Sequence, residues 1–302
     1  MSLSVVAVER ALDIEQIAPR GRATSRWRRT WRRFTRQRIA IAALVLVILI
    51  GLAALLAPII RPYDPADITG DFMAGPSAAH LLGTDGTGRD LLSRMLFGAR
   101  VSFLGSLLAV AVAFGGGTII GLVSGYAGGL VDLVIMRCAD AVLAFPGLLT
   151  AMAVIGALGV GEVQAMLGLA IAFTPAFARL VRGEVLAVRE QDYISAARVI
   201  GAPSGWIVRR HVFANIAPPL IIDVAQLMGG AIIAEGGLAF LGISVQPPAA
   251  SLGSLLQDGF SNMNVTPRLL LAPGIAIMIL ATCFNAIADG LRDAIAKQDT
   301  TA

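Results

Sequence analysis

Uncharged, apolar stretches long enough to cross a lipid bilayer recur along this chain. The first, Ile39–Ile60, has 22 residues and no charged side chain. As an α-helix it would extend about 33 Å, against about 30 Å for the hydrocarbon core of a bilayer. A cleaved signal peptide would have a shorter apolar region of about 7–15 residues, so we interpret Ile39–Ile60 as a retained span.

Six such stretches predict a polytopic, all-α membrane protein with six transmembrane helices. Lipid offers no partner to backbone N–H and C=O groups, and no barrel-like alternation is present, so every span should be helical. Hydrophobic residues make up 56% of the chain and charged residues 15%, which excludes ordinary soluble domains. The predicted spans are Ile39–Ile60, Val101–Tyr126, Met136–Leu158, Val163–Leu180, Ile216–Leu241 and Leu269–Ala288. Prolines should kink or break helices locally at Pro146, Pro175 and Pro218–Pro219.

The arginine distribution predicts the orientation of these spans. Residues 1–38 hold ten arginines and the connection 178–212 holds six, whereas 242–268 holds one. Because cytoplasmic loops are enriched in Arg and Lys, both termini and the loop 181–212 should be cytoplasmic. The connections expected outside are 61–98 and 242–266.

The chain accordingly divides into five predicted parts. They are a basic cytoplasmic arm (1–38), a first transmembrane helix (39–60), an extracytoplasmic segment (61–98), a five-helix core (99–296) and a C-terminal tail (297–302). The bias of 23 arginines to one lysine indicates a GC-rich bacterial genome. A nucleic-acid-binding arm is the alternative for 1–38, but the arm runs directly into an apolar helix, so we predict no nucleic-acid partner.

Small residues recur every fourth position in the second predicted span. Such a ridge lets a neighbouring helix approach closely, and it would also suit a moving or pore-lining helix. Its members are Ala109, Ala113, Gly117, Gly121, Gly125 and Gly129.

Side chains that could carry chemistry are scarce. Lys297 is the only lysine, so a phosphate-binding GxxxxGK[ST] loop cannot form. His80 and His211 lie on opposite predicted sides of the membrane, and Cys138 and Cys283 belong to no metal-binding motif. We therefore predict a non-catalytic subunit that binds no cofactor or metal, and whose energy comes from a partner or an ion gradient.

Three polar side chains in the fifth predicted span are candidates for the transport pathway. Asp223 and Gln226 are about one turn apart, and Glu235 lies about three turns beyond Asp223. Ionisable groups within spans are costly and often functional. Interhelical hydrogen bonds or a wet interfacial position are the alternative. Arg137 and Asp140, spaced i and i+3, should form an intrahelical ion pair.

The loop 181–212 predicts two short helices separated by a tight turn. Residues 192–201 are typical of a helix, and Gly201 is a natural stop for it. Pro203 should then lie in the first turn of the next helix, which carries an exposed Trp206. This arrangement favours a docking knob, with an amphipathic connector lying on the membrane surface as the alternative.

The same loop carries a resemblance to a known family. Ser195-Ala-Ala-x3-Gly201, followed by His211-Val-Phe-Ala-Asn215, resembles the EAA loop of permeases in binding-protein-dependent ABC importers. Within these, the chain resembles the second (C-type) permease of the dipeptide/oligopeptide/nickel subfamily. Further blocks similar to that subfamily begin at His80 (HLLGTDGTGRD), Gly125 (GYAGGLVD), Gly242 (GISVQPP) and Asp289 (DGLRD).

The resemblance implies a type I ABC importer permease in the bacterial inner membrane that forms half of a pathway for peptides. Nickel, haem or another small solute is the alternative cargo. The alternative mechanism is an ion-coupled secondary transporter, with Asp223 or Glu235 as proton relay. ATP and Mg would bind partner ATPase subunits. The other implied partners are a homologous second permease, an extracytoplasmic substrate-binding protein and the lipid bilayer. The implied ATPase coupling residues are Ser195, Ala196, Ala197, Gly201, Ala202, Pro203, Ser204, Gly205 and Trp206.

Three positions depart from the subfamily pattern. The acidic residue that opens the EAA motif is Ser195 here, so its contact with the ATPase is lost or moves to Asp192. Asp223 occupies a position that is normally apolar. The outer loop has Ser251-Leu252-Gly253 where the subfamily has a central tryptophan.

Overall fold

The computed structural model describes residues 30–69 and 71–299, and within them every regular element is helical. Five helices are long and apolar enough to cross a membrane. They are α3 (Arg38–Leu55), α5 (Leu91–Ala127), α8 (Glu162–Arg189), α11 (Phe213–Phe240) and α13 (Arg268–Asp299). The all-α membrane fold predicted from the sequence is confirmed.

The third predicted span, Met136–Leu158, is not one continuous helix, and the sixth crossing of the membrane depends on whether its two parts together form one broken span. It is divided into α6 (Gly129–Leu143) and α7 (Gly147–Leu158), which are bent by 88° at the break. Pro146 immediately precedes α7; because its ring excludes a helical backbone bond, the chain turns there. The predicted break at Pro146 is thus confirmed.

The other prolines do not break their helices. Pro175 lies within α8, and Pro218 and Pro219 lie within α11. Packing neighbours can compensate for the lost backbone bonds in a membrane helix. A short π-helical turn, Val208–Val212, directly precedes α11.

Several helices are longer than the sequence predicted. α5 begins at Leu91 rather than Val101, because the Asp90 side chain accepts a hydrogen bond from the backbone N–H of Ser93 at 2.8 Å and caps the helix. α8 continues to Arg189, so the predicted loop 181–212 is helical in its first part. The first predicted span is divided into α3 and α4 (Ala57–Ile60).

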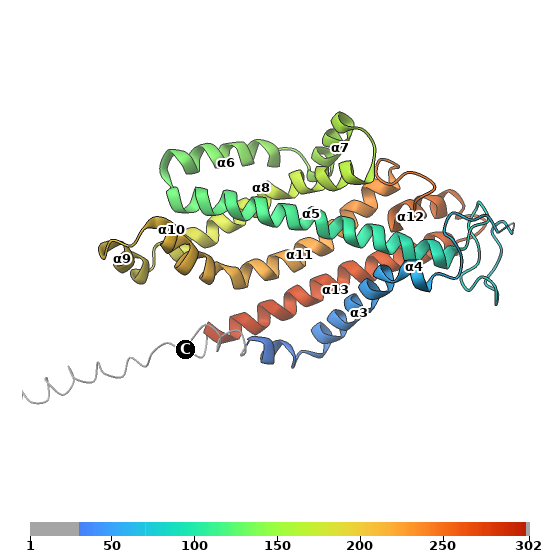
Figure 1. Ribbon diagram of the computed structural model, residues 1–302, viewed down its shortest axis with the longest axis horizontal. Coiled ribbons are helices and arrows are strands. Elements are labelled where there is room, and N and C mark those ends of the chain that lie inside the picture. Colours follow the sequence, from blue (N-terminus) through green and yellow to red (C-terminus); the bar gives the residue numbers. More distant parts are fainter. Residues whose placement is uncertain (1–29, 70, 300–302) are drawn as a thin grey trace, which may run out of the picture.

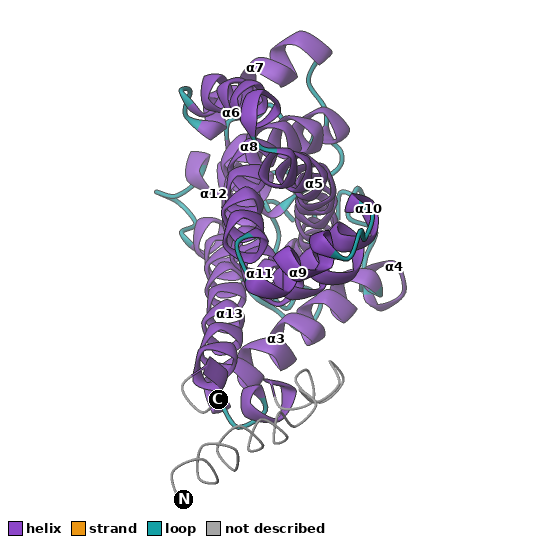
Figure 2. Cartoon of the chain, turned by 90° about the vertical axis from the view of Figure 1, so that its left-hand side faces the viewer, coloured by secondary structure: helices purple, strands orange, loops and turns teal. Residues whose placement is uncertain are grey.

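The long helices run along the molecule, and most connecting segments lie at its two ends, whereas the connection between α6 and α7 lies midway along it (Figure 1). At one end, α9 (Asp192–Val199) and α10 (Ser204–Ile207) project beyond the bundle, on the side where α3 begins and α13 ends (Figures 1 and 2). At the other end, the segment 61–90 meets α12 (Leu252–Ser261). The two predicted outer connections therefore lie together, opposite the predicted docking knob.

The glycine ridge of α5 packs directly on α8, and this is the most extensive helix contact in the described chain. A Cβ atom at Gly121 would lie 2.6 Å from the Cβ of Val181, and one at Gly125 would lie 2.9 Å from the Cβ of Val185. Any side chain there would force the helices apart, which confirms the predicted close approach. Gly129 does not belong to the contact, because it opens α6 with a φ of +55°.

We expect Gly121→Ala to lower the thermal stability of the purified protein in detergent. Overpacking a tight contact costs about 1–3 kcal/mol. Gly115→Ala is the matched control, since a Cβ at Gly115 of the same helix would meet nothing within 4 Å. The control should unfold at the wild-type temperature or slightly above it; equal melting temperatures for the two variants would contradict the packing assignment.

Candidate functional site

The projecting helices α9 and α10, with the turn between them, form a knob anchored to the bundle by apolar side chains. Ile194 and Ile207 are fully buried, and Ala197 is nearly so. They pack in one cluster with side chains of α8, of α11 and of the π-helical turn that precedes α11. The partners in this cluster are Phe177, Val181, Val185, Val212, Ile216 and Leu220. The knob is therefore continuous with the cores of two spanning helices.

The turn of the knob is closed by backbone hydrogen bonds around Gly201. The Gly201 N–H donates to the Arg198 carbonyl at 3.0 Å, and the Ala202 N–H donates to the Ala197 carbonyl at 3.1 Å. This pair of bonds is a Schellman motif, which requires a left-handed residue; Gly201 supplies it with a φ of +80°. The predicted stop at Gly201 is confirmed. Pro203 is the N-cap of α10, just before the first turn in which it was expected.

Apolar groups cover much of the outer surface of the knob. Val199 is 87% exposed, Ile200 81% and Trp206 48%. The Trp206 ring lies edge-on to His211, with ring centroids 4.8 Å apart. The sequence analysis did not single out Val199 and Ile200, although two apolar residues just before a stop glycine were a usable signal. Exposed apolar surface of this kind is common where a protein contacts another protein or a membrane.

The remaining predicted coupling residues are arranged around this surface. Ser195, Ala196, Pro203, Ser204 and Gly205 are exposed. Ala202 is half-buried and packs against the knob's core. Asp192, in the first turn of α9, is exposed.

Two arginines tie α8 to the end of α5 and the start of α6. The Arg182 guanidinium donates two hydrogen bonds to Asp132, each 2.5 Å long. Arg189 donates to the carbonyls of Gly125 and Tyr126, both at 3.1 Å. Sequence reasoning used these arginines only as a topology signal, because the partners lie fifty or more positions away. Such bidentate pairs are geometrically specific and hold the base of the knob.

Arg137 and Asp140 form the predicted intrahelical pair, with Nη1 and Oδ2 3.9 Å apart. Asp140 also accepts a hydrogen bond from Arg179 of α8, a partner that helical spacing alone could not reveal.

The three candidate pathway residues do not form one cluster. Asp223 is half-buried, with Glu184 and Arg292 as charged neighbours. The exposed Gln226 accepts a hydrogen bond from Arg292 at 3.0 Å. Glu235, about three turns away along α11, is only 3% exposed.

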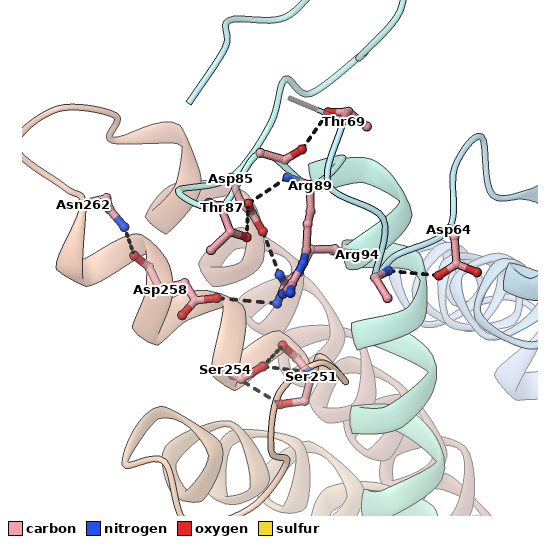
Figure 3. Close-up of polar contacts among 12 residues, drawn as sticks. Asp64, Thr69, Asp85, Thr87, Arg89, Arg94, Ser251, Ser254, Asp258 and Asn262 are labelled. Atoms are coloured by element: carbon pink, nitrogen blue, oxygen red, sulfur yellow. Dashed lines mark hydrogen bonds and ion pairs between the residues drawn. The ribbon is translucent and has the colours of Figure 1, made fainter. Parts of the chain in front are cut away.

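A polar network holds the segment 61–90 against α12 at the end opposite the knob (Figure 3). Asp85 accepts hydrogen bonds from the backbone N–H groups of Thr87 at 2.7 Å and Arg89 at 3.0 Å. It also accepts one from Arg94 at 2.7 Å, and both side chains of this pair are about 5% exposed. Arg94 reaches Asp258 of α12 at 3.6 Å. Partial burial raises the pKa of Asp258, and Arg94 opposes this shift.

Further contacts complete this folded segment, which we call the cap (residues 61–90). The His80 Nδ1 atom lies 2.9 Å from an oxygen of Asp90, the residue that also caps α5 through Ser93. Arg268, at the start of α13, donates to the carbonyl of Met73 at 2.9 Å. Across the described residues, no group of three or more His, Cys, Asp or Glu side chains is arranged to hold a metal ion.

Comparison with known proteins gives this arrangement a family. Residues 117–298 match the model of the binding-protein-dependent transport system inner membrane component. The chain belongs to this family. Residues 25–76, which include the first span, match a second model, the N-terminal transmembrane domain of oligopeptide transport permease C. This agrees with the C-type resemblance seen in the sequence.

Full-length relatives agree with the family assignment. The chain is 40% identical over 272 residues to the glutathione transport system permease protein GsiD of Pectobacterium atrosepticum, covering 89% of this chain and 90% of that protein. It is 38% identical over 271 residues to the Escherichia coli GsiD, covering 89% of each. It is 36% identical over 274 residues to the dipeptide transport system permease protein DppC of Alkalihalophilus pseudofirmus, covering 90% of each.

The network at the cap predicts an asymmetric response to removal of its two carboxylates. Asp85→Asn leaves the buried Arg94 without its main partner, which should cost about 3–5 kcal/mol of stability. Asp258→Asn should cost about 0–1 kcal/mol, because the Asp258 side chain is half-exposed and its contact is longer. Thermal unfolding of the purified variants measures both; equal losses would contradict the assignment of Asp85 as the anchor.

Proposed function

We propose that this permease forms half of the translocation pathway of an ATP-driven importer of peptides, with glutathione and dipeptides as the cargo class. Family membership makes the chain a transport permease, a non-catalytic membrane subunit. The observation that carries the choice of cargo is that relatives named for glutathione and for dipeptide transport both match along about nine-tenths of the chain.

The knob is the part of this permease that contacts the ATPase subunits, where ATP and Mg bind. Its exposed apolar surface supplies the contact, and its buried side chains belong to the same cluster as those of α8 and α11. A push from the closing ATPases would therefore move both helices together. Such rigid-body movement of packed elements alternates access between the two sides of a membrane.

The cap end faces the outside and receives the substrate-loaded binding protein. Apolar side chains stand exposed there on both the cap and the α12–α13 connection. A partner protein would cover such surface. The exposed residues are Ile68, Phe72, Leu81, Met263 and Val265.

Asp223 and Gln226 line the half of the pathway nearer the knob. Both are accessible in this single chain and are close to Arg292 of α13. A homologous second permease would complete the pathway around them, and the bacterial inner membrane holds the pair.

Uptake of labelled glutathione and alanyl-alanine by cells that carry the complete transporter tests this function through the knob. We expect uptake with the wild-type chain and a roughly tenfold or greater loss with Gly201→Val, because a branched side chain strains the left-handed turn by about 1–2 kcal/mol or more. Trp206→Ala should act in the same direction by removing aromatic contact area.

Gly201→Asn is the matched control, since asparagine tolerates the left-handed conformation. It should retain most of the uptake. Co-purification of the ATPase subunits is measured in parallel, because the proposal requires weakened or uncoupled ATPases in Gly201→Val. Normal uptake and normal ATPase binding in that variant would overturn the coupling role of the knob. Uptake of neither substrate by the wild type would overturn the cargo assignment.

The proposed orientation predicts which positions an impermeant thiol reagent can label in intact cells. Single cysteines at Thr69, Ser204 and Ser261 are introduced after replacement of Cys138 and Cys283. Because arginine enrichment predicts a cytoplasmic position for the loop with Ser204, Thr69 and Ser261 should be labelled while Ser204 is protected. Labelling of Ser204 alone would reverse the topology.

A further inference from the structure

Glu235 is a carboxyl group buried where three helices meet. Its side chain comes from the half of α11 nearer the cap and is 3% exposed. Neither carboxyl oxygen has a partner in hydrogen-bond geometry. The polar groups that approach it are the hydroxyls of Ser102 in α5 and Ser251 at the start of α12. Burying a carboxyl group without hydrogen-bond partners costs free energy, and such groups are rare in folded proteins.

The hydroxyl oxygens of both serines already accept hydrogen bonds from backbone N–H groups in the first turn of α12. The Ser102 hydroxyl accepts the N–H of Leu252 at 3.1 Å, and the Ser251 hydroxyl accepts the N–H of Ser254 at 3.2 Å. Each hydroxyl therefore has one proton left to donate. Glu235 is an acceptor within reach of both, and it lies beside the helix N-terminus that favours negative charge.

Close backbone packing holds α12 in this position. A Cβ atom at Gly98 of α5 would lie 3.0 Å from the carbonyl carbon of Ser251. One at Gly253 would lie 2.7 Å from the Cβ of Ala239 in α11. The start of α12 is thus wedged between α5 and α11. Its far end is held to α5 by the contact between Asp258 and Arg94, and Arg94 also pairs with Asp85 of the cap (Figure 3).

We propose that Glu235 is a positioning residue that fastens α12 to α5 and α11 and thereby transmits displacement of the cap end into α11. α11 continues through the π-helical turn Val208–Val212 into α10 of the knob, so a single run of helix links Glu235 to the knob. The inference rests on the proposed function, because the two ends are then the sites for the binding protein and the ATPases. Binding of a partner at either end then changes the affinity for the partner at the other end, because both partners act on the position of α11.

The test uses the complete transporter reconstituted in liposomes, and measures ATPase activity with and without its binding protein loaded with glutathione. Glu235→Gln keeps the shape of the side chain but replaces one of the two carboxyl oxygens that could accept the serine hydroxyls with an amide donor. We expect normal assembly and normal basal ATPase activity, with stimulation by the loaded binding protein reduced by roughly tenfold. Glu162→Gln is the matched control, because it neutralises a neighbouring carboxyl of α8 and should leave stimulation unchanged.

A second variant covers a failure of Glu235→Gln to assemble. Ser251→Ala leaves Glu235 in place and removes one of its donors, and it should reduce stimulation while basal activity stays normal. Wild-type stimulation in whichever of the two variants assembles overturns the proposal. A changed KM for glutathione relative to alanyl-alanine, with normal stimulation, also overturns it and makes Glu235 a substrate contact. Absence of stimulation in the wild type would instead refute the proposed function.

Discussion

The burial of Ile194 and Ile207 in the cluster shared by α8 and α11 is the contact on which the rest of the structure depends. Short helices such as α9 and α10 have little stability of their own in water. They keep a fixed shape because their apolar side chains are removed from solvent against two long spans, and because the Gly201 turn satisfies the backbone between them. This anchoring packs the knob directly against both spans.

Buried and half-buried polar contacts fix the geometry that apolar packing alone leaves open. Lipid-facing helices can slide or rotate at little cost, since hydrocarbon outside is as apolar as the side chains inside. The bidentate pair of Arg182 and Asp132 sets the position of α8 against α6 near the knob, and the pair of Arg94 and Asp85 sets the cap on α5. α11 runs from the knob end, where Arg182 pairs with Asp132, to the cap end, where Arg94 pairs with Asp85. Its residue Glu235 lies beside α12 at the cap end.

Much of this architecture follows from the sequence, because the physics that produces it is local. Uncharged runs of about twenty residues specify spans, and the turn at Gly201 follows from one residue that tolerates a left-handed backbone. The recurrence of glycine every fourth residue likewise predicted the close contact that Gly121 makes with α8. The sequence predicted a break at Pro146 but not its angle of 88°, because the angle depends on how α7 packs against α8. The contacts of Glu235 with Ser102 and Ser251 join residues far apart in the chain, so no spacing rule could reveal them.

The central claim is that the knob moves as one body with α8. Spin labels at Val199 in the knob and Leu167 in α8, both exposed positions, allow their separation to be measured by pulsed electron paramagnetic resonance in the assembled transporter. The account predicts the same narrow Val199–Leu167 distance distribution with and without ATP. The distance from Val199 to the equivalent knob position of the second permease, labelled in the same assembled transporter, should change. A shift or broadening of the Val199–Leu167 distance on addition of ATP would show that the knob pivots on the spans, and would contradict the account.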